Sequence, residues 1–340
     1  MSESDLAATL QRTDQWFLRH GLTYFVPEQR AAVRAALRPR RTALPTVLGF
    51  VVAAVLGVLL GWATGQAGTG VALLLTVGAL GVAWYALTAL RFRPILAWAL
   101  GRTFGSLARL LPMVSRALPL LLLFVTFLFI NADVWQMSAY LEPGTLWLTA
   151  LLFAVSAIAF LLVRLPEEVD RVDDDVDGAF LTRACRGTPL EGPCAELLAD
   201  AEAGRGPDPA AYATITGYER WNLVLALLVI QAVQVLLIAV AVFGFFVVFG
   251  ALVLDDAVQQ AWTGLDNVHS LSWLPSVSVE LVQVSVFLAA FSLLYITVST
   301  VTDETYRAQF FGTVLRELER AVGMRAVYLA LRARDRDTRE

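Results

Sequence analysis

Polar residues that could do chemistry lie inside two long apolar segments in the second half of the chain. Glu280 is the foremost of them, because an ionisable side chain within a membrane is usually functional. Ser278, Ser285 and Ser292 recur every seven residues, about two helical turns, so they share one helical face. The whole candidate polar path consists of Glu280, Gln283, Ser278, Ser285, Ser292, Gln231 and Gln234.

Two interpretations of this polar set stay open. The side chains could line a polar path or a ligand pocket between two membrane-spanning helices. Alternatively, the serines and glutamines hydrogen-bond between neighbouring helices, which is a common way of holding a membrane bundle together.

A second candidate set is acidic and lies in the links between apolar segments. A ring of carboxylates at a pore mouth would concentrate cations. The alternative is that membrane topology keeps arginine out of external links and leaves the acidic residues behind. The possible external acidic mouth consists of Asp133, Asp255, Asp256 and Asp266.

Other motifs in the chain are incomplete. Asp173, Asp175 and Asp177 begin a calcium-loop pattern, but Ala184 stands where the bidentate glutamate is required. Cys185 and Cys194 have no histidine nearby, and the chain contains no phosphate-binding loop, nucleophile elbow or metalloprotease motif. We therefore expect no catalytic residue, no metal site and no cofactor, and we do not expect an enzyme.

Apolar segments of this length predict a polytopic membrane protein. The chain of 340 residues is 57% hydrophobic with a mean hydropathy of +0.64, well above the composition of soluble proteins. Trp221–Val253 holds no charged residue and would extend about 50 Å as a helix, more than the hydrocarbon core requires. We predict an all-α bundle of six transmembrane helices, at about 44–64, 70–90, 118–134, 145–163, 221–253 and 277–301.

The distribution of arginine predicts the topology of these six helices. All 26 basic residues are arginine, and six spans place every one of them on the cytoplasmic side, together with both termini. The net charge of −4 is too small to imply a nucleic-acid partner. The predicted divisions are the N-terminal amphipathic helices 1–43, spans 44–163 with an interfacial helix 92–117, a cytoplasmic acidic insert 164–220, spans 221–302 with an external loop 254–275, and a C-terminal amphipathic helix 303–340.

Glycines at four-residue spacing mark the first predicted span. Gly57, Gly61 and Gly65 lie on one helical face and allow another backbone to approach closely. The partner could be a helix of the same chain or a second protomer, so a homo-oligomer through these glycines is one prediction. Membrane lipids are the other expected partners.

Two stretches of the chain resemble a known group of proteins. WFLRHGLTYFVP (16–27) and YERWNLVLALLVIQAVQVLLIAVAVFGFFVVFG (218–250) are similar to segments of actinobacterial integral membrane proteins with no assigned function. The resemblance implies a shared fold and the plasma membrane of a Gram-positive bacterium. It implies no activity and no site residue.

Two functional hypotheses from different classes follow. The first is a channel or transporter-like protein with a polar path along the two C-terminal spans. The alternative is a non-transporting membrane scaffold or sensor that recruits a cytoplasmic partner, and an enzyme with an unrecognised site is a weaker third option. A continuous polar cavity containing Glu280 and Gln283 would favour transport, whereas a dry helix core would favour the alternative.

Overall fold

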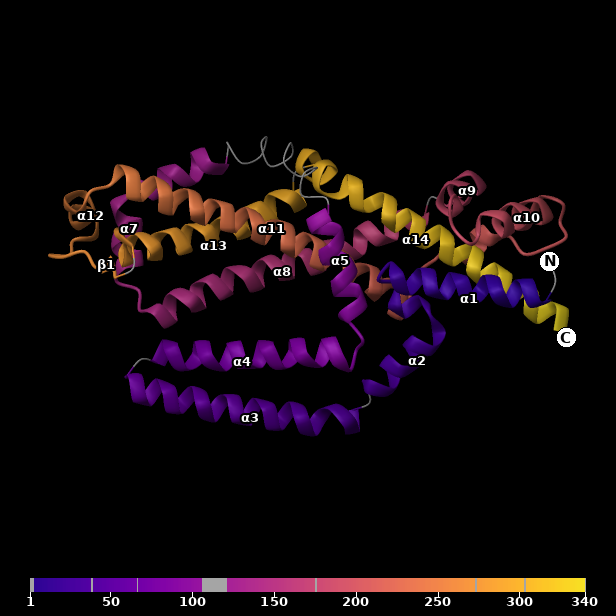
Figure 1. Cartoon of the computed structure of the whole chain (residues 1–340), viewed down its shortest axis with the longest axis horizontal. Coiled ribbons are helices and arrows are strands. Elements are labelled where there is room, and N and C mark those ends of the chain that lie inside the picture. The colour runs from indigo at the N-terminus through magenta and orange to yellow at the C-terminus, as the bar shows by residue number, and fades with distance from the viewer. Residues whose placement is uncertain are drawn as a thin grey trace.

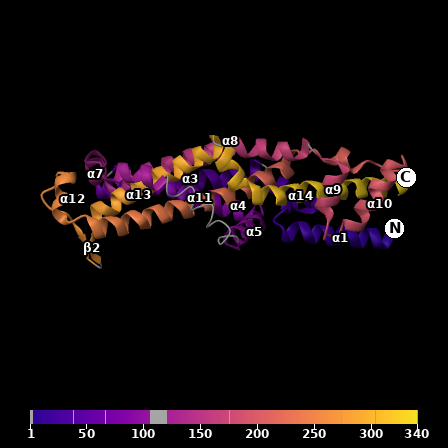
Figure 2. The same ribbon diagram turned by 90° about the horizontal axis from the view of Figure 1, so that it is seen from above.

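The computed structural model describes residues 3–37, 39–65, 67–105, 121–174, 176–272, 274–302 and 304–339. Residues 106–117 of the predicted interfacial helix, 118–120 of the third predicted span, and Asp175 lie outside the described residues. Within them the chain is almost entirely helical and forms an elongated molecule, with Glu3 and Arg339 at the same end (Figures 1 and 2). This end carries the charged helices, and long apolar helices extend from it to the other end.

The apolar helices are long enough to mark the chain as a membrane-embedded protein. Four segments have the length and hydropathy of a membrane span, namely Gly70–Thr88, Pro143–Val172, Gly217–Val253 and Val279–Ser299. Leu121–Phe129 and Ala132–Ala139 form a fifth candidate if this pair, bent by 71°, is one span. These candidates belong to α4 (Ala67–Thr88), α7 (Ala132–Ala139), α8 (Pro143–Asp174), α11 (Gly217–Val253) and α13 (Val279–Thr302), and α3 (Pro39–Thr64) contains a shorter apolar helix, Val51–Ala63.

Helices α8, α11 and α13 form the apolar core, with α13 packed against both of the others. A Cβ added to Gly250 of α11 would lie 2.3 Å from Leu281 Cδ1, so this glycine makes room for a leucine of α13. Phe246 stacks on Phe129 at 4.7 Å, and the buried Trp135 donates a hydrogen bond from Nε1 to the Phe129 carbonyl oxygen at 2.6 Å. Large interdigitated side chains therefore hold this part together.

Helices α3 and α4 form a separate hairpin, which is held together differently. A Cβ added to Gly70 would lie 2.4 Å from the Gly57 carbonyl oxygen, so the two backbones touch and only glycine fits there. Of the residues in Gly70–Thr88, 6% are buried, against 44% in Val279–Ser299. In Figure 1 the hairpin lies beside α8, at the edge of the molecule.

The charged end is a helical bundle, which we call the charged bundle. It consists of the ends of α8 and α11 together with α1 (Glu3–Arg19), η1 (Thr23–Phe25), α2 (Pro27–Ala36), α9 (Gly178–Cys185), α10 (Glu191–Glu202), η2 (Pro209–Tyr212) and α14 (Glu304–Arg339). The insert packs on α14, where a Cβ added to Gly323 would lie 2.4 Å from Ala184 Cβ. Helix α5 (Arg93–Gly105) packs on α11 between this bundle and the apolar helices (Figure 1).

The opposite end is more regular than the sequence predicts. The link after residue 130 contains α7, whose N-terminus is capped by the Asn131 side chain. The predicted loop 254–275 contains α12 (Asp256–Thr263), capped by Asp255, and an antiparallel hairpin of β1 (Ser270–Leu271) and β2 (Leu274–Ser278). Local side-chain caps satisfy the first amides of these short helices, which is why they form in segments that read as loops.

Helix α8 also continues beyond its predicted end at residue 163. It passes Pro166 and reaches Asp174. Arg164 forms ion pairs with Glu167 and Glu168 one turn further along, and these pairs support the helix beyond the proline. Helix α8, like α11, therefore runs unbroken from the apolar core into the charged bundle.

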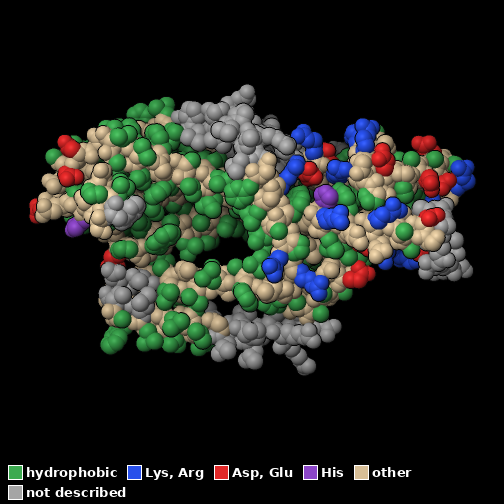
Figure 3. Space-filling view, viewed as in Figure 1, with side chains coloured by type: hydrophobic (Ala, Val, Ile, Leu, Met, Phe, Trp, Pro, Cys, Tyr) green, Lys and Arg blue, Asp and Glu red, His purple; other side chains and the backbone are tan. Residues whose placement is uncertain are grey.

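Charge is unevenly distributed along the molecule. On the face drawn in Figure 3, arginine side chains gather over the charged bundle, and acidic side chains lie at both ends. No arginine lies in the described parts of residues 121–163 or 221–302. We call the end formed by α7, α12 and the β-hairpin the arginine-free end.

Candidate functional site

Glu280 lies in the first turn of α13 and is almost completely buried, at 3% exposure. Its two carboxylate oxygens accept hydrogen bonds from the His269 backbone N–H at 3.3 and 3.1 Å, and the His269 ring Nδ1 lies 2.8 Å from Oε1. The Val279 N–H donates to the His269 carbonyl oxygen at 2.7 Å. Glu280 therefore connects the β-hairpin to the start of the helix. The helix dipole also stabilises a carboxylate at this position.

Ser278 and Gln259 join the same region to α12. The Ser278 hydroxyl donates to Gln259 Oε1 at 2.5 Å and accepts the Leu281 N–H at 2.9 Å, so it caps α13. Gln259 donates from Nε2 to the Leu254 carbonyl oxygen at 3.3 Å. These bonds are structural connections between the helices of the arginine-free end.

Two further members of the predicted path also bond to backbone. The Ser292 hydroxyl donates to the Leu288 carbonyl oxygen at 2.7 Å, within its own helix. Gln283 donates from Nε2 to the Leu141 carbonyl oxygen at 3.4 Å and so ties α13 to the segment before α8. Both contacts fit the interpretation of these polar residues as connections between and within helices.

Three buried side chains of the predicted path have unpaired polar atoms within the described part of the chain. They are both amide atoms of Gln231, Oε1 of Gln234 and the hydroxyl of Ser285, and all three residues are 5% exposed or less. Leaving such an atom without a partner costs about 1–3 kcal/mol. These residues are the part of the predicted path that the local structure leaves unexplained.

The unpaired residues lie at different depths. Helices α11 and α13 run antiparallel, with Gly250 against Leu281, so Ser285 lies level with the region of Phe246. Gln234 is twelve residues from Phe246, about 18 Å along α11. The predicted path is thus spread along the helices. Ser278, Glu280, Gln283 and Ser285 lie towards the arginine-free end, whereas Ser292, Gln231 and Gln234 lie near the middle of α13 and α11.

The cavity that the structure contains at this level of α11 and α13 is apolar. A groove of about 400 Å³ lies between α8, α11 and α13. Alanines line it from all three helices, beside larger side chains such as Phe243 and Leu293. No member of the predicted polar path lines this groove.

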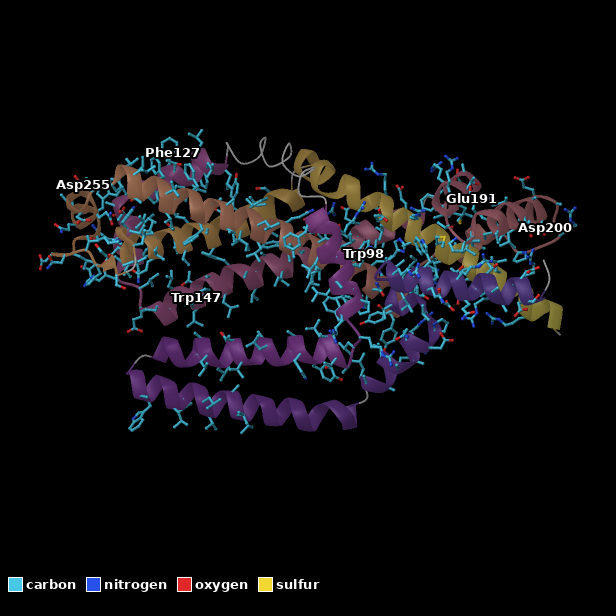
Figure 4. The ribbon with its side chains drawn as sticks, in the orientation of Figure 1. Trp98, Phe127, Trp147, Glu191, Asp200 and Asp255 are labelled. Carbon is cyan, nitrogen blue, oxygen red and sulfur yellow. The ribbon has the colours of Figure 1, made fainter. Side chains whose placement is uncertain are left out.

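The predicted acidic mouth lies on exposed helix starts at the arginine-free end. Asp255 Oδ1 accepts the Val258 N–H at 2.9 Å, and Asp256 follows in the first turn of α12 (Figure 4). Asp133 is in the first turn of α7, which packs against α12, and Asp266 lies in the following loop. Carboxylates at helix N-termini stabilise those helices, so Asp255 has a local structural role.

The structure also contains a buried ionic cluster that sequence reasoning missed. Glu219, 3% exposed, accepts a hydrogen bond from Arg325 Nε at 2.6 Å and lies 2.8 Å from Arg30 Nη2. Arg325 Nη1 donates to the carbonyl oxygens of Tyr212 and Thr214 at 2.7 and 3.0 Å. This cluster joins α2, the start of α11 and α14 through residues that are far apart in the sequence.

Asn222 makes a second long-range connection at the start of α11. It donates from Nδ2 to the Gly21 carbonyl oxygen at 2.9 Å and accepts the Tyr24 N–H at 2.7 Å. The asparagine is fully buried. Its signal in the sequence is a single amide next to Trp221 at the start of an uncharged segment, which carries no information about its partner.

The remaining titratable groups of the charged bundle have ordinary structural roles. Cys185 and Cys194 are buried against each other, and their hydrogen bond together with burial raises the pKa of Cys185, so it stays a thiol. Asp177, from the acidic run, caps α9 by accepting the Phe180 N–H at 2.6 Å. Among the described residues, no group of three or more His, Cys, Asp or Glu side chains is placed to hold a metal ion.

Comparisons with known proteins add no assignment. No family model matches the chain, and no curated protein or solved structure matches it. The resemblance to actinobacterial membrane proteins therefore stays a prediction.

Proposed function

We propose that the chain crosses the membrane six times, with the charged bundle and both termini in the cytoplasm. The spans are α3, α4, the bent segment 121–139, α8, α11 and α13. The distribution of arginine supports this orientation. Exposed tryptophans support it too, because Trp62 and Trp147 lie towards the arginine-free end and Trp84 and Trp221 towards the charged bundle, as in two interfacial belts.

Within this topology we infer a non-transporting membrane sensor, in which the α3–α4 hairpin reports the state of the bilayer to the charged bundle. The observation that carries the inference is the set of bonds at the inner end of the hairpin. Tyr24 donates its hydroxyl to the Leu90 carbonyl oxygen and Tyr85 donates to the Ala36 carbonyl oxygen, both at 2.8 Å. Arg91 also bonds to Gln29 of α2.

The rest of the structure is suited to receive such a signal. Gly70–Thr88 of the hairpin is only 6% buried, whereas α8 and α11 continue from the apolar core into the charged bundle. The Glu219–Arg325 pair and the Asn222 bonds fix α11 to its neighbours there. A displacement of the hairpin would therefore act on α2 and η1 while the core stays in place.

A cytoplasmic partner, if one is recruited, would meet a charged surface. No large apolar side chain of α1, α9, α10 or residues 316–336 is exposed, within the part of these helices that the structure describes. On the face drawn in Figure 3, most of the charged side chains lie over this part of the molecule. Recruitment would accordingly weaken with rising salt.

Hydrogen exchange in nanodiscs of short-chain and long-chain lipids tests the proposal. We expect the exchange of α2 and η1 to change with bilayer thickness in the wild type, and to change less in Tyr85→Phe, which loses the bond to Ala36. Tyr140→Phe is the matched control, because Tyr140 is exposed at the arginine-free end. Equal exchange of α2 in both lipids would contradict the proposal.

A channel or transporter is the second candidate, favoured by the unpaired amide atoms of Gln231 and the unpaired Oε1 of Gln234 within the described residues. Water could satisfy these atoms and form part of a hydrated path. Ion flux into liposomes containing the purified protein, compared with Glu280→Ala and Gln231→Leu, separates the two functions. The sensor predicts no flux for any of the three proteins, and flux that a substitution abolishes would favour transport.

A further inference from the structure

The α3–α4 hairpin touches α8 at the arginine-free end and diverges from it towards the charged bundle, where the link from α4 to α5 closes the space (Figure 1). At the arginine-free end, a Cβ added to Gly68 would lie 2.8 Å from Thr145 Oγ1. At the other end the chain leaves α4 and rises to α5, and the Leu90 carbonyl oxygen is bonded to Tyr24. Figure 3 shows empty space between α4 and α8, and we call this opening the slot.

Both sides of the slot lie at the depth of the bilayer hydrocarbon. They are formed by Gly70–Thr88 and by the part of α8 within Pro143–Val172, two candidate spans. Neither α4 nor residues 143–163 of α8 contain a charged residue. Large apolar side chains are exposed on both helices, including Leu80 and Val82 on α4 and Leu152 and Val155 on α8. Water does not occupy such an apolar space favourably.

The closed ends of the slot decide what can fill it. A transmembrane helix of a partner must cross about 30 Å of hydrocarbon and both interfaces. Here the Gly68–Thr145 contact blocks one interface, and the link after α4 blocks the other. A lipid acyl chain ends near the middle of the bilayer and enters sideways, so it fits without breaking either contact.

The inner end of the slot carries positive charge. Arg91 lies in the link between α4 and α5, Arg93 is the first residue of α5, and both are exposed. Arg91 bonds to Gln29, and the guanidinium group of Arg93 makes no hydrogen bond or ion pair within the described part of the chain. Figure 3 shows arginine side chains beside this end of the slot. Two guanidinium groups at the level of the headgroups match a lipid phosphate.

We propose that the slot is a binding site for an anionic phospholipid, with its acyl chain between α4 and α8 and its headgroup phosphate against Arg91 and Arg93. The bound chain would fill the apolar space that the hairpin and α8 leave open. The site does not depend on the sensor function, because a lipid can hold the hairpin in place without transmitting any signal.

Titration with phosphatidylglycerol tests the site on the full chain in detergent, with native mass spectrometry as the readout. We expect the wild type to bind phosphatidylglycerol more tightly than phosphatidylcholine. In the Arg91→Gln/Arg93→Gln double variant, the binding of phosphatidylglycerol should become roughly thirtyfold weaker. Arg12→Gln/Arg205→Gln is the matched control, since both arginines are exposed on the charged bundle, and it should bind like the wild type. Equal affinity of the wild type and the Arg91/Arg93 variant would overturn the proposal.

A second measurement locates the acyl chain in the unmodified protein. Phosphatidylglycerol with a photoreactive group near the end of its acyl chain should label residues 70–88 and 145–163 more than other exposed apolar positions, such as Val248 and Leu252 of α11. Labelling spread over all helices in proportion to their exposure would contradict a defined site. This outcome does not bear on the sensor proposal, which the exchange experiment tests separately.

Discussion

The α3–α4 hairpin and the α11–α13 pair are both made of antiparallel apolar helices that meet at a glycine, yet they pack differently. Gly57 and Gly70 bring two backbones together, and the atoms nearest to a Cβ added at Gly70 are backbone atoms of Gly57 and Gly61. Gly250 instead receives Leu281, and Phe246 packs beside it on Phe129. A glycine on an apolar helix therefore allows close approach of a second helix. Where the facing group is a large side chain, the two helices pack as part of a core, and where it is backbone, they form a separate hairpin.

The position of α11 in the apolar core depends on the ionic cluster of Glu219, Arg30 and Arg325 at the start of this helix. Arg325→Ala would leave Glu219 buried with its partnership to Arg30 alone, and removing one partner of a buried pair costs about 3–5 kcal/mol. We expect the largest loss of stability from this change, measured by thermal unfolding in detergent. Arg316→Ala, at an exposed position of the same helix, is the control and should have little effect. Equal losses in the two variants would show that the cluster does not anchor α11.

The packing of α3 against α4 depends on the contact between Gly57 and Gly70. Gly70→Leu would force the two backbones apart and cost about 1–3 kcal/mol or more. Gly78→Leu is the matched control, because nothing lies within 4 Å of a Cβ added there. We expect protease accessibility of the α3–α4 turn to increase in the first variant alone. A wild-type digestion pattern in Gly70→Leu would contradict the backbone packing.

Gly250 differs from Gly70 because it faces the end of the flexible Leu281 side chain and not a backbone. Gly250→Ala should lower stability by about 1 kcal/mol as Leu281 shifts. Gly244→Ala, where a Cβ meets nothing within 4 Å, should raise stability by about 0.5–1 kcal/mol through helix propensity. The sign of the change thus distinguishes the two glycines, and the same sign at both positions would show that Leu281 is not packed there.

The smallest expected effect concerns Asp14 in the charged bundle. Burial is the main cause that raises its pKa above 3.8, although the hydrogen bond from Tyr328 opposes this. Because the folded-state pKa is the higher one, wild-type stability decreases as the pH rises through that pKa. Asp14→Asn should therefore be more stable than the wild type at pH 7, with the difference vanishing below about pH 3.8, as measured by unfolding at several pH values. A difference that grows towards low pH would show that the sign is wrong.

The sequence predicts helices well where length and composition decide, and contacts poorly where distant segments meet. The uncharged run after Trp221 predicts α11 because no other structure satisfies its backbone in lipid. The glycine spacing predicts close approach at Gly57, but the neighbour at Gly70 is not part of that signal. Four or five spans are evident from length and hydropathy, and a sixth stays part of our proposal.

The candidate site was predicted less completely. Glu280 stands out in the sequence as an acidic residue in an apolar helix. Its contact with His269 depends on the β-hairpin, which the sequence of residues 254–275 does not predict. The Glu219–Arg325 contact joins residues from separate elements, so periodicity along one helix cannot reveal it. Helix α7 forms because Asn131 caps it locally and because Trp135 is buried, and only the burial of Trp135 depends on tertiary structure.

The central claim is that the hairpin moves relative to a fixed core when the thickness of the bilayer changes. Double electron–electron resonance, which measures the distance between two spin labels, tests this claim most directly. Labels at Gly78→Cys and Leu152→Cys report the hairpin against α8, and labels at Val240→Cys and Leu152→Cys report the core, with Cys185 and Cys194 replaced by serine. We predict that the first distance changes between nanodiscs of short-chain and long-chain lipids while the second stays constant. A constant distance between the hairpin and α8 would contradict the account.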